Sequence, residues 1–212
     1  MAKNKRSPSF AFPDLRLERA LWRKGHRYIG GVDEAGRGAW AGPVAAAVVI
    51  LPQDASLSRT LQGVRDSKQM TRLQRLFWAG RIQEVAVDWG VGFTAAAEID
   101  QMGIVPATRL AVMRAFETIT TMPEYLLVDY LQIPEAKIPQ SPIVKGDTRS
   151  LSIAAASILA KVARDSLMFA FEGQYAGYGF AQNKGYGTPQ HQKAIHRAGL
   201  CEIHRKSFAI AR

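Results

Sequence analysis

Two adjacent carboxylates followed by closely spaced glycines constrain the fold of this chain more than any other feature. Asp33 ends an apolar segment, residues 27–33, Glu34 follows it, and a second apolar segment spans residues 44–51. Three glycines lie between the two segments: Gly36, Gly38 and Gly42. Successive side chains of a strand point to opposite faces, so we expect Asp33 to face a pocket and Glu34 to leave the path of the strand. The pattern predicts two strands joined by a tight turn that carries acids.

The glycine spacing has two other interpretations. A dinucleotide-binding loop needs a helix immediately afterwards, so that the helix N-terminus meets the pyrophosphate. Here Pro43 and the β-branched run at 48–50 predict a strand instead. The plainer alternative is a glycine-rich hairpin whose Asp-Glu pair has no function. The turn alone does not decide between a hairpin and a binding site.

Length and composition limit the class of protein. The chain has 212 residues, 47% of them hydrophobic, which is enough for one sizeable core. No apolar run reaches the roughly 18 residues that a membrane span needs, and no signal-peptide pattern follows the basic N-terminus. The single cysteine, Cys201, excludes an internal disulfide framework and a cysteine-based zinc site. We therefore expect a cytoplasmic protein with no membrane segment.

Positive charge is concentrated at the two ends of the chain. The formal net charge is +10. Residues 1–27 hold eight basic and two acidic side chains, residues 184–212 hold six basic and one acidic, and the middle is close to neutral. A near-neutral body with basic ends suits a polyanionic partner, most simply a nucleic acid. The alternative for the N-terminal end is a basic tail that only improves solubility.

The hydropathy pattern alternates between short strands and longer helices. Strands are expected at 27–33, 44–51, 85–95, 124–129 and 143–144. Helices are expected at 15–24, 57–62, 71–83, 96–102, 106–120, 148–171 and 188–198, and disorder at 1–12. Thr71 and Thr188 are the expected N-caps of their helices. This order predicts an α/β sheet whose functional site lies at the strand ends.

Four carboxylates follow apolar runs, where burying a charge is costly unless it is paired. They are Asp33, Glu34, Asp129 and Asp147. Brought together, they would raise one another's pKa, and a bound divalent cation resolves that conflict. Ligand sets made only of oxygen favour Mg²⁺, with Mn²⁺ possible, and two such ions about 4 Å apart can promote phosphodiester hydrolysis. Taken singly, Asp129 could be a solvent-facing acid and Asp147 a simple helix cap.

Several other side chains also allow two interpretations. Arg37, between glycines, could meet a sugar or a phosphate, or be a surface arginine. Lys68 could hold a phosphate as a point charge or be a solvated loop lysine. Lys161 and Arg164, on the long helix predicted at 148–171, could contact a ligand or form a solvated face. The acid that follows them, Asp165, is expected to pair with a neighbouring cation rather than bind a metal.

Six motifs of the chain resemble the bacterial ribonuclease HII family, the type 2 ribonucleases H, over roughly residues 27 to 208. They are Asp33–Gly38, Asp66–Lys68, Val128-Asp129, Lys145–Asp147, Ile153–Asp165 and Lys184–Thr188. The resemblance implies a ribonuclease H-like α/β fold: a five-stranded mixed sheet flanked by helices, with a C-terminal helical extension. It also implies endonucleolytic cleavage of RNA in RNA–DNA hybrids, leaving 3′-hydroxyl and 5′-phosphate ends. We further expect cleavage 5′ of a single ribonucleotide in duplex DNA.

The resemblance also assigns expected roles to individual residues. It places the four carboxylates named above at the positions that bind Mg²⁺ or Mn²⁺. It implies substrate contacts from Gly36, Arg37, Gly38, Lys68, Lys184 and Tyr186. Within this set, the Gly-Arg-Gly segment would read the ribose 2′-hydroxyl, and Tyr186 would lie against the sugar of the following nucleotide.

The resemblance further predicts how the chain is organised. A basic N-terminal extension is expected at 1–26, the catalytic domain at 27–174 and a substrate-binding helical extension at 175–212, in a protein that acts as a monomer. The chain departs from the family at Tyr130, where the family usually has glycine after the third acid. We therefore expect the loop before Asp147 to differ in shape.

Two rival functions remain compatible with the motifs. The first is a nucleic-acid-binding module of the same fold without catalysis, although gathering four acids opposite phosphates would weaken such a binder. The second is another nuclease of this fold, such as a junction resolvase or an integrase core, because a fold does not fix a substrate. Cleavage that depends on the 2′-hydroxyl distinguishes the predicted ribonuclease from both.

Overall fold

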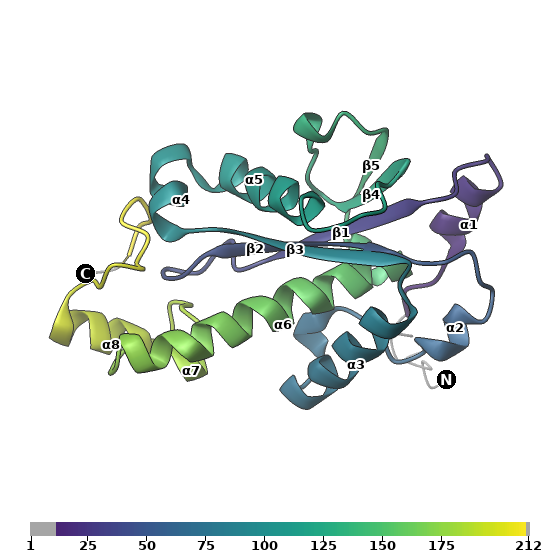
Figure 1. Cartoon of the computed structure of the whole chain (residues 1–212). Coiled ribbons are helices and arrows are strands. Elements are labelled where there is room, and N and C mark those ends of the chain that lie inside the picture. The colour runs from purple at the N-terminus through teal and green to yellow at the C-terminus, as the bar shows by residue number, and fades with distance from the viewer. Residues whose placement is uncertain (1–11, 211–212) are drawn as a thin grey trace, which may run out of the picture.

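The computed structural model describes residues 12–210, and its centre is one mixed five-stranded sheet (Figure 1). The strands are β1 (Ile29–Ala35), β2 (Val44–Ile50), β3 (Asp88–Thr94), β4 (Tyr125–Asp129) and β5 (Gln140–Ile143). Their order across the sheet is β3-β2-β1-β4-β5. The pairs β1–β2 and β2–β3 are antiparallel, whereas β1–β4 and β4–β5 are parallel. The predicted five-stranded mixed sheet is confirmed.

Helices cover both faces of the sheet (Figure 1). On one face lie α4 (Ala96–Met102) and α5 (Ile104–Phe116), and on the other lie α3 (Arg72–Val85) and the long α6 (Leu151–Gln174). The shorter helices are α1 (Arg16–Trp22), α2 (Leu57–Thr60), α7 (Phe180–Asn183) and α8 (Pro189–Ala198). None of the helices between residues 12 and 210 is long and apolar enough to cross a membrane.

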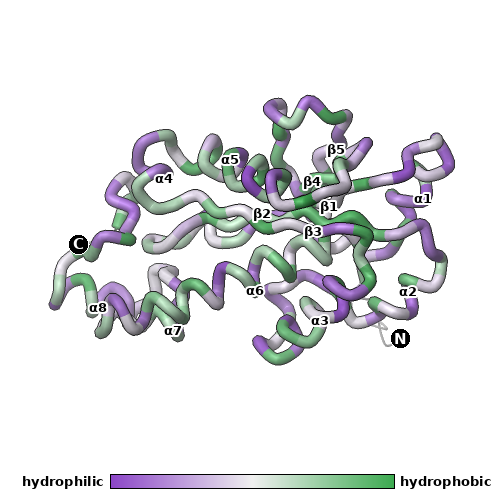
Figure 2. The backbone as a smooth tube through the Cα atoms, viewed as in Figure 1, coloured by the Kyte–Doolittle hydropathy of each residue, from purple (hydrophilic) through white to green (hydrophobic). Residues whose placement is uncertain are grey.

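Strand β2 is buried on both faces because the sheet has helices on both sides. All seven of its residues are buried. Ala47 and Val49 pack with the α3 and α6 residues, while Ala46 and Val48 pack with the α5 residues. This explains why its sequence is continuously apolar rather than alternating. Figure 2 shows hydrophobic residues concentrated along the central strands.

Small residues let α6 approach the sheet closely. A side chain at Gly31 of β1 would collide with the backbone of Ser152 on α6. The facing helix carries alanines at 154–156, all fully buried. Because the backbones are in direct contact here, α6 packs closely against β1, the strand that carries Asp33. This contact fixes the position of β1 relative to the helix.

Some element boundaries differ from those that the sequence predicts. Strand β1 continues through Glu34 to Ala35, so the expectation that Glu34 leaves the strand path is wrong; pairing with Ala46 and Ala45 of β2 keeps the chain extended. Strand β5 lies at Gln140–Ile143 rather than at 143–144, because pairing with β4 selects this register.

The interpretation of Asp147 as a plain helix cap is also wrong. Asp147 lies in a 3₁₀ turn, Gly146–Thr148, and α6 begins only at Leu151. The N-cap of α6 is Ser150, whose hydroxyl accepts a hydrogen bond from the Ile153 amide. The caps predicted at Thr71 and Thr188 are confirmed, since both hydroxyls accept a hydrogen bond from the amide three residues on.

Helix α1 is anchored in the body of the protein. Leu15 and Leu21 are buried, and buried Glu18 accepts hydrogen bonds from the hydroxyls of Ser150 and Ser152 at the start of α6. The basic helix expected at 15–24 is thus present and packed. Residues 1–11, which carry most of the segment expected to be disordered, lie outside the described residues.

Tyr130 adopts a backbone conformation that normally favours glycine. Its φ is 57° and its side chain is 67% exposed. The left-handed region costs a non-glycine residue about 1–2 kcal/mol. Tyr130 therefore holds a strained conformation that glycine would adopt without strain.

Replacing Tyr130 with glycine is expected to stabilise the fold by about 1 kcal/mol, because relief of the left-handed strain outweighs the entropy that glycine adds to the unfolded chain. For a chain of this size that corresponds to a rise in Tm of about 2–4 °C. Thermal unfolding followed by circular dichroism measures the change. Tyr130→Ala is the control, since it removes the ring and keeps the strain; equal Tm values for the two variants would contradict the backbone explanation.

Candidate active site

Sheet topology brings three of the four predicted carboxylates to one edge. Strands β1 and β4 are parallel neighbours with Val32 opposite Val128, so the next residues, Asp33 within β1 and Asp129 at the end of β4, lie side by side. The turn that follows β5 returns to the same place, because the Gly146 amide donates a 2.7 Å hydrogen bond to Asp129 Oδ1. Asp147, the residue after Gly146, is therefore beside Asp129.

The Asp33 and Glu34 carboxylates are held at an electrostatic cost. Burial raises the pKa of Asp33 well above its usual range, and the neighbouring charges of Glu34 and Asp129 raise it further. Burial also raises the pKa of Glu34, opposed by Arg37, whose Nη1 donates to Glu34 Oε1 at 3.3 Å. A site that gathers carboxylates at such a cost is one in which a cation would be bound favourably.

Asp147 shares this environment with a carboxylate that sequence analysis did not select. Burial raises the pKa of Asp147 to about 6, and Asp66 and Asp129 contribute after burial. Asp66 caps the short turn that carries Lys68, accepting a 3.0 Å hydrogen bond from its amide. Although burial lowers the pKa of Lys68, the surrounding carboxylates raise it above its ordinary value. Only the Asp-Ser-Lys motif itself could have drawn attention to Asp66.

The carboxylates are close enough to repel one another but are not gathered into a ligand shell. Within residues 12–210, no three His, Cys, Asp or Glu side chains already form a group that could hold a metal ion. The donor chemistry nevertheless fits a hard divalent cation, because every candidate donor is a carboxylate oxygen and burial opposes its charge. Ion binding would draw these side chains together.

A cavity of about 480 Å³ opens beside the glycine turn. Most of the predicted substrate-binding residues line it, together with Ser67 and Ser157, which were not predicted to do so, and Lys161, for which the sequence left two interpretations open. The lining residues are Glu34, Ala35, Gly36, Arg37, Gly38, Ser67, Lys68, Ser157, Lys161 and Tyr186. Lys184 is the exception among the predicted contacts, since it faces a neighbouring hollow instead. Asp33, Asp129 and Asp147 lie close to this lining, since their charges raise the pKa of Lys68.

Two buried arginines hold the glycine turn in place by donating hydrogen bonds to its carbonyl oxygens and to those of neighbouring residues. Arg205 donates to the carbonyl oxygens of Gly36, Arg37 and Gly42 at 2.7, 2.8 and 3.0 Å. Arg164 binds the carbonyl oxygens of a second set of residues, at distances from 2.8 to 3.0 Å: Ala41, Pro43 and Lys184.

Both guanidinium groups are fully buried, so the solvated-face interpretation of Arg164 is wrong. Sequence analysis did not identify Arg205 at all, since no local pattern marks a buried arginine that lies 163 to 169 residues from the carbonyl groups it supports. Together the two arginines satisfy the carbonyl groups of an irregular loop that would otherwise be buried without partners.

The same loop is joined to the segment that carries Tyr186. The amides of Trp40 and Ala41 both donate to the Gly185 carbonyl oxygen, at 2.7 and 3.1 Å. The Tyr186 ring lies 5.5 Å from Lys161 Nζ and 5.4 Å from the Arg164 guanidinium carbon. Segments far apart in the sequence thus place one aromatic face opposite the Gly-Arg-Gly turn.

A chain of hydrogen bonds with a fixed direction supports the Tyr186 carbonyl group. That carbonyl can only accept, so His191 Nδ1 donates to it, at 3.0 Å. His191 Nε2 must then accept from His204 Nε2, also at 3.0 Å, and His204 Nδ1 accepts from the Cys201 amide. Both imidazoles are therefore neutral, and burial lowers the pKa of each, that of His204 to about 4.

The profile of the ribonuclease HII family matches residues 30–211. The chain belongs to the ribonuclease HII family. Ribonuclease HII of Desulfitobacterium hafniense (strain Y51) is 50% identical over 195 residues, which is 92% of this chain and 74% of that protein. A member of this family is a ribonuclease H, a hydrolase that cleaves RNA internally in RNA–DNA hybrids.

Solved structures agree with the family assignment at the level of the fold. The ribonuclease H2 of Pyrococcus horikoshii OT3 superposes with a TM-score of 0.73 at 25% identity, over 87% of this chain and 95% of that one. Bst-RNase HIII, whose structure is a complex with Mn²⁺, superposes with a TM-score of 0.60 at 19% identity, over 87% of this chain and 68% of that one. The family's ribonuclease H-like fold therefore agrees with the observed sheet.

Proposed function

We propose that this member of the ribonuclease HII family is a divalent-metal-dependent endonuclease that cuts RNA–DNA hybrids and also cuts 5′ of single ribonucleotides in duplex DNA. The observation that carries the proposal is the convergence of buried Asp33, neighbouring Asp129 and buried Asp147 beside a cavity lined by the Gly-Arg-Gly turn and Tyr186. The products would have 3′-hydroxyl and 5′-phosphate ends, as needed for removing ribonucleotides from DNA. We expect the enzyme to act as a monomer in the cytoplasm.

The residues that would hold the metal are Asp33, Glu34, Asp129 and Asp147. Mg²⁺ or Mn²⁺ bound there would supply an activated water and charge stabilisation at the leaving oxygen. The site offers oxygen donors only, which suits both ions. Lys68, surrounded by carboxylates whose charges raise its pKa, would hold the phosphate next to the cut as a point charge.

The remaining residues of the cavity would bind and orient the substrate. The backbone of Gly36 and Gly38 and the Arg37 side chain would hydrogen-bond the ribose 2′-hydroxyl, the group that distinguishes RNA from DNA. Arg205 and Arg164 keep this turn in place from behind. Rigid placement matters because a misplaced contact of about 1 Å can cost a hundredfold in rate.

We propose that Tyr186 selects the nucleotide on the 3′ side of the ribonucleotide. Its ring is part of the cavity wall, flanked by Lys161. A flat ring packs well against a deoxyribose, which lacks the 2′-hydroxyl. The Gly-Arg-Gly turn would then contact the ribose of the ribonucleotide through a polar contact, and Tyr186 would contact the deoxyribose of the next nucleotide through an apolar one. The enzyme would thereby recognise the junction between a ribonucleotide and the deoxyribonucleotide that follows it.

Cleavage of a DNA duplex that carries one ribonucleotide tests this proposal. Wild-type enzyme is expected to cut on the 5′ side of the ribonucleotide. Tyr186→Ala is expected to lose about tenfold or more in kcat/KM on this substrate, on the scale of 1–3 kcal/mol for an aromatic contact to a nucleotide. Tyr186→Phe, which retains the ring, is the matched control and should stay close to wild type; an alanine variant with full activity would refute the role of the ring.

The rival assignment to a junction resolvase or integrase-like nuclease predicts a different result. Such an enzyme would cut without regard to the 2′-hydroxyl, so an all-DNA duplex of the same sequence would be cleaved as well. A binding module without catalysis would cut neither substrate at any Mg²⁺ or Mn²⁺ concentration. The two duplexes therefore separate all three functions in one assay.

A further inference from the structure

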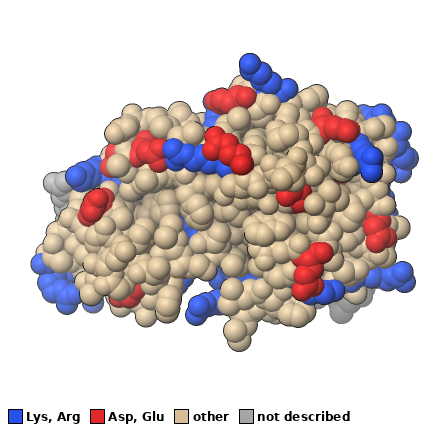
Figure 3. Space-filling view, in the orientation of Figure 1, with Lys and Arg blue, Asp and Glu red and all other residues tan. Residues whose placement is uncertain are grey.

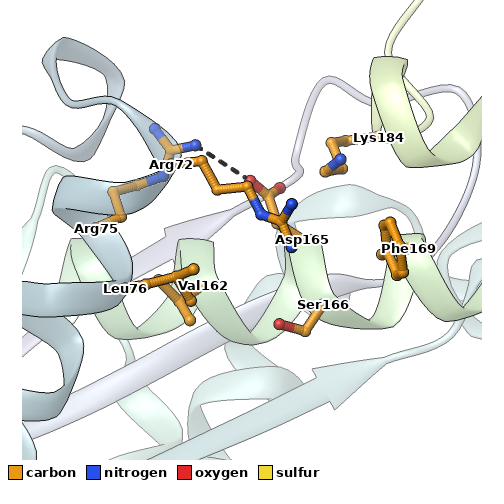
Figure 4. Close-up of a pocket in the computed structure, with 8 residues that line it drawn as sticks. All are labelled: Arg72, Arg75, Leu76, Val162, Asp165, Ser166, Phe169 and Lys184. Carbon is orange, nitrogen blue, oxygen red and sulfur yellow. Dashed lines mark ion pairs between the residues drawn. The ribbon is translucent and has the colours of Figure 1, made fainter.

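A second group of basic side chains lies beside the cavity, and it adds Arg72 and Arg75 to Lys184, which the family resemblance already implied as a substrate contact. Arg72 and Arg75 come from α3, Lys184 comes from the residue after α7, and all three surround Asp165 of α6 (Figure 4). Figure 3 shows an indentation in the lower edge of the molecule between the α3 and α7 regions, with basic side chains beside it. Three cations around one carboxylate leave an excess of positive charge.

Each oxygen of the single carboxylate already has a cationic partner. Asp165 Oδ1 accepts from Lys161 Nζ at 2.7 Å, and Asp165 Oδ2 lies 3.5 Å from Arg75 Nη2. Arg75 also donates to the carbonyl oxygens of Ser67 and Met70, at 3.0 and 2.6 Å, so it is a structural link to the turn that carries Lys68. This also confirms the expectation that Asp165 pairs with neighbouring cations.

Arg72 and Lys184 are the cations left over. Within residues 12–210, neither of them forms an ion pair. Arg72 is exposed, with its guanidinium carbon 5.5 Å from the centre of the exposed Phe169 ring. Burial lowers the pKa of Lys184, and the charges of Arg72 and Lys161 lower it further against the opposing effect of Asp165. An anion placed between these two side chains would relieve that repulsion.

We propose that Arg72 and Lys184 form a phosphate subsite for the backbone of the nucleic acid bound in the neighbouring cavity. This inference rests on the proposed function and extends it to the substrate beyond the cut. Lys161 belongs to both regions, since it lines the cavity and pairs with Asp165. From Lys161 to Phe169 along α6 is about 12 Å, or roughly three to four nucleotides of one strand along a duplex axis.

The shape of the hollow favours a strand over a free anion. The hollow holds only about 20 Å³, about enough for one water molecule. A phosphate would therefore lie at its mouth, between Arg72 and Lys184, as a backbone phosphate of a duplex can. The Phe169 ring supports the Arg72 guanidinium from one side by a cation–π contact, which leaves its donors free to meet the strand.

The subsite is tested by the binding and cleavage of a long RNA–DNA hybrid by Arg72→Ala. We expect KM to rise about tenfold at low salt while kcat is retained, because a charge-assisted contact to the strand is lost away from the cut. The slope of log Kd against log salt should fall by about 0.9, the value of one phosphate contact. Arg72→Lys should keep the slope, since it keeps the charge.

Arg59→Ala is the matched control, because Arg59 is an exposed arginine on α2 without an ion pair among the described residues. It should leave KM and the salt slope unchanged. Wild-type cleavage of the hybrid tests the proposed function, whereas only the difference between wild type and Arg72→Ala tests the subsite, so the two can fail separately.

Hybrids shortened from each end in turn locate the contact. On one of the two shortened hybrids, Arg72→Ala should have the same KM as wild type, because the shortened strand no longer reaches the hollow. The proposal would be overturned if Arg72→Ala had a raised KM on both shortened hybrids, or if it had a wild-type KM on the long hybrid. The last experiment adds inorganic phosphate at constant ionic strength. If phosphate raises the Tm of wild type but not of Arg72→Ala, the hollow binds free anions, and the proposal that it binds a backbone phosphate of the nucleic acid is wrong.

Discussion

Replacing Asp33 with asparagine is expected to reduce cleavage of an RNA–DNA hybrid by about a thousandfold or more. Asp33 lies on β1 beside Asp129, and losing a proposed metal ligand would remove several kcal/mol of transition-state stabilisation, each 1.36 kcal/mol being a factor of ten. Glu34→Gln, Asp129→Asn and Asp147→Asn should behave similarly. Initial rates at saturating Mg²⁺ measure the effect.

The same change is expected to leave the fold intact or make it more stable. Burial, Glu34 and Asp129 raise the pKa of Asp33, so its ionised form is disfavoured in the folded protein and a neutral side chain of the same shape relieves that cost. Added Mg²⁺ or Mn²⁺ should raise the Tm of wild type, because the ion binds the folded state, and should do so less in Asp33→Asn.

The control for this prediction is Asp54→Asn, at an exposed carboxylate before α2. It should keep wild-type activity and the wild-type response to metal. Near-wild-type cleavage by folded Asp33→Asn protein would refute the metal-binding assignment, whatever its Tm.

Replacing Arg205 with alanine is expected to destabilise the protein by about 3–5 kcal/mol, because a buried charged group that donates to three carbonyl oxygens is removed and those oxygens lose their partners. Activity should fall with stability, since the freed carbonyls belong to the turn that carries Arg37. Urea unfolding gives the free energy, and kcat/KM on a hybrid gives the functional loss.

Two comparisons keep this prediction decisive if the alanine variant folds poorly. Arg205→Lys keeps the charge, but its single ammonium nitrogen cannot occupy the three positions from which Nε, Nη1 and Nη2 each donate to a different carbonyl oxygen. It should therefore fall between wild type and alanine in both measurements. Lys206→Ala, at the exposed neighbouring residue, should match wild type. An Arg205→Lys variant indistinguishable from wild type in stability and activity would show that the three carbonyl contacts do not hold the turn.

The sequence alone determined where the chemistry would be. Hydrophobic runs mark the central strands because both of their faces are buried. In the sequence, Asp33 and Asp129 end such runs, and Asp147 follows the next run after two residues. Strand ends in an α/β sheet meet at one edge, so local patterning was enough to predict that these carboxylates converge. Cap positions such as Thr71 and Thr188 were predictable for the same reason, since capping depends on residues only three apart.

Only the tertiary structure decided what holds the site in shape. Arg164 and Arg205 lie more than 100 residues from the carbonyl groups that they bind near the glycine turn, and no local periodicity distinguishes a buried arginine from a solvated one. The same is true of Asp66 beside Asp147 and of Arg72 beside Lys184, because charges interact through space after folding brings them together. Strand register likewise placed β5 three residues earlier than its own residues suggest, since pairing with β4 outweighs local preference.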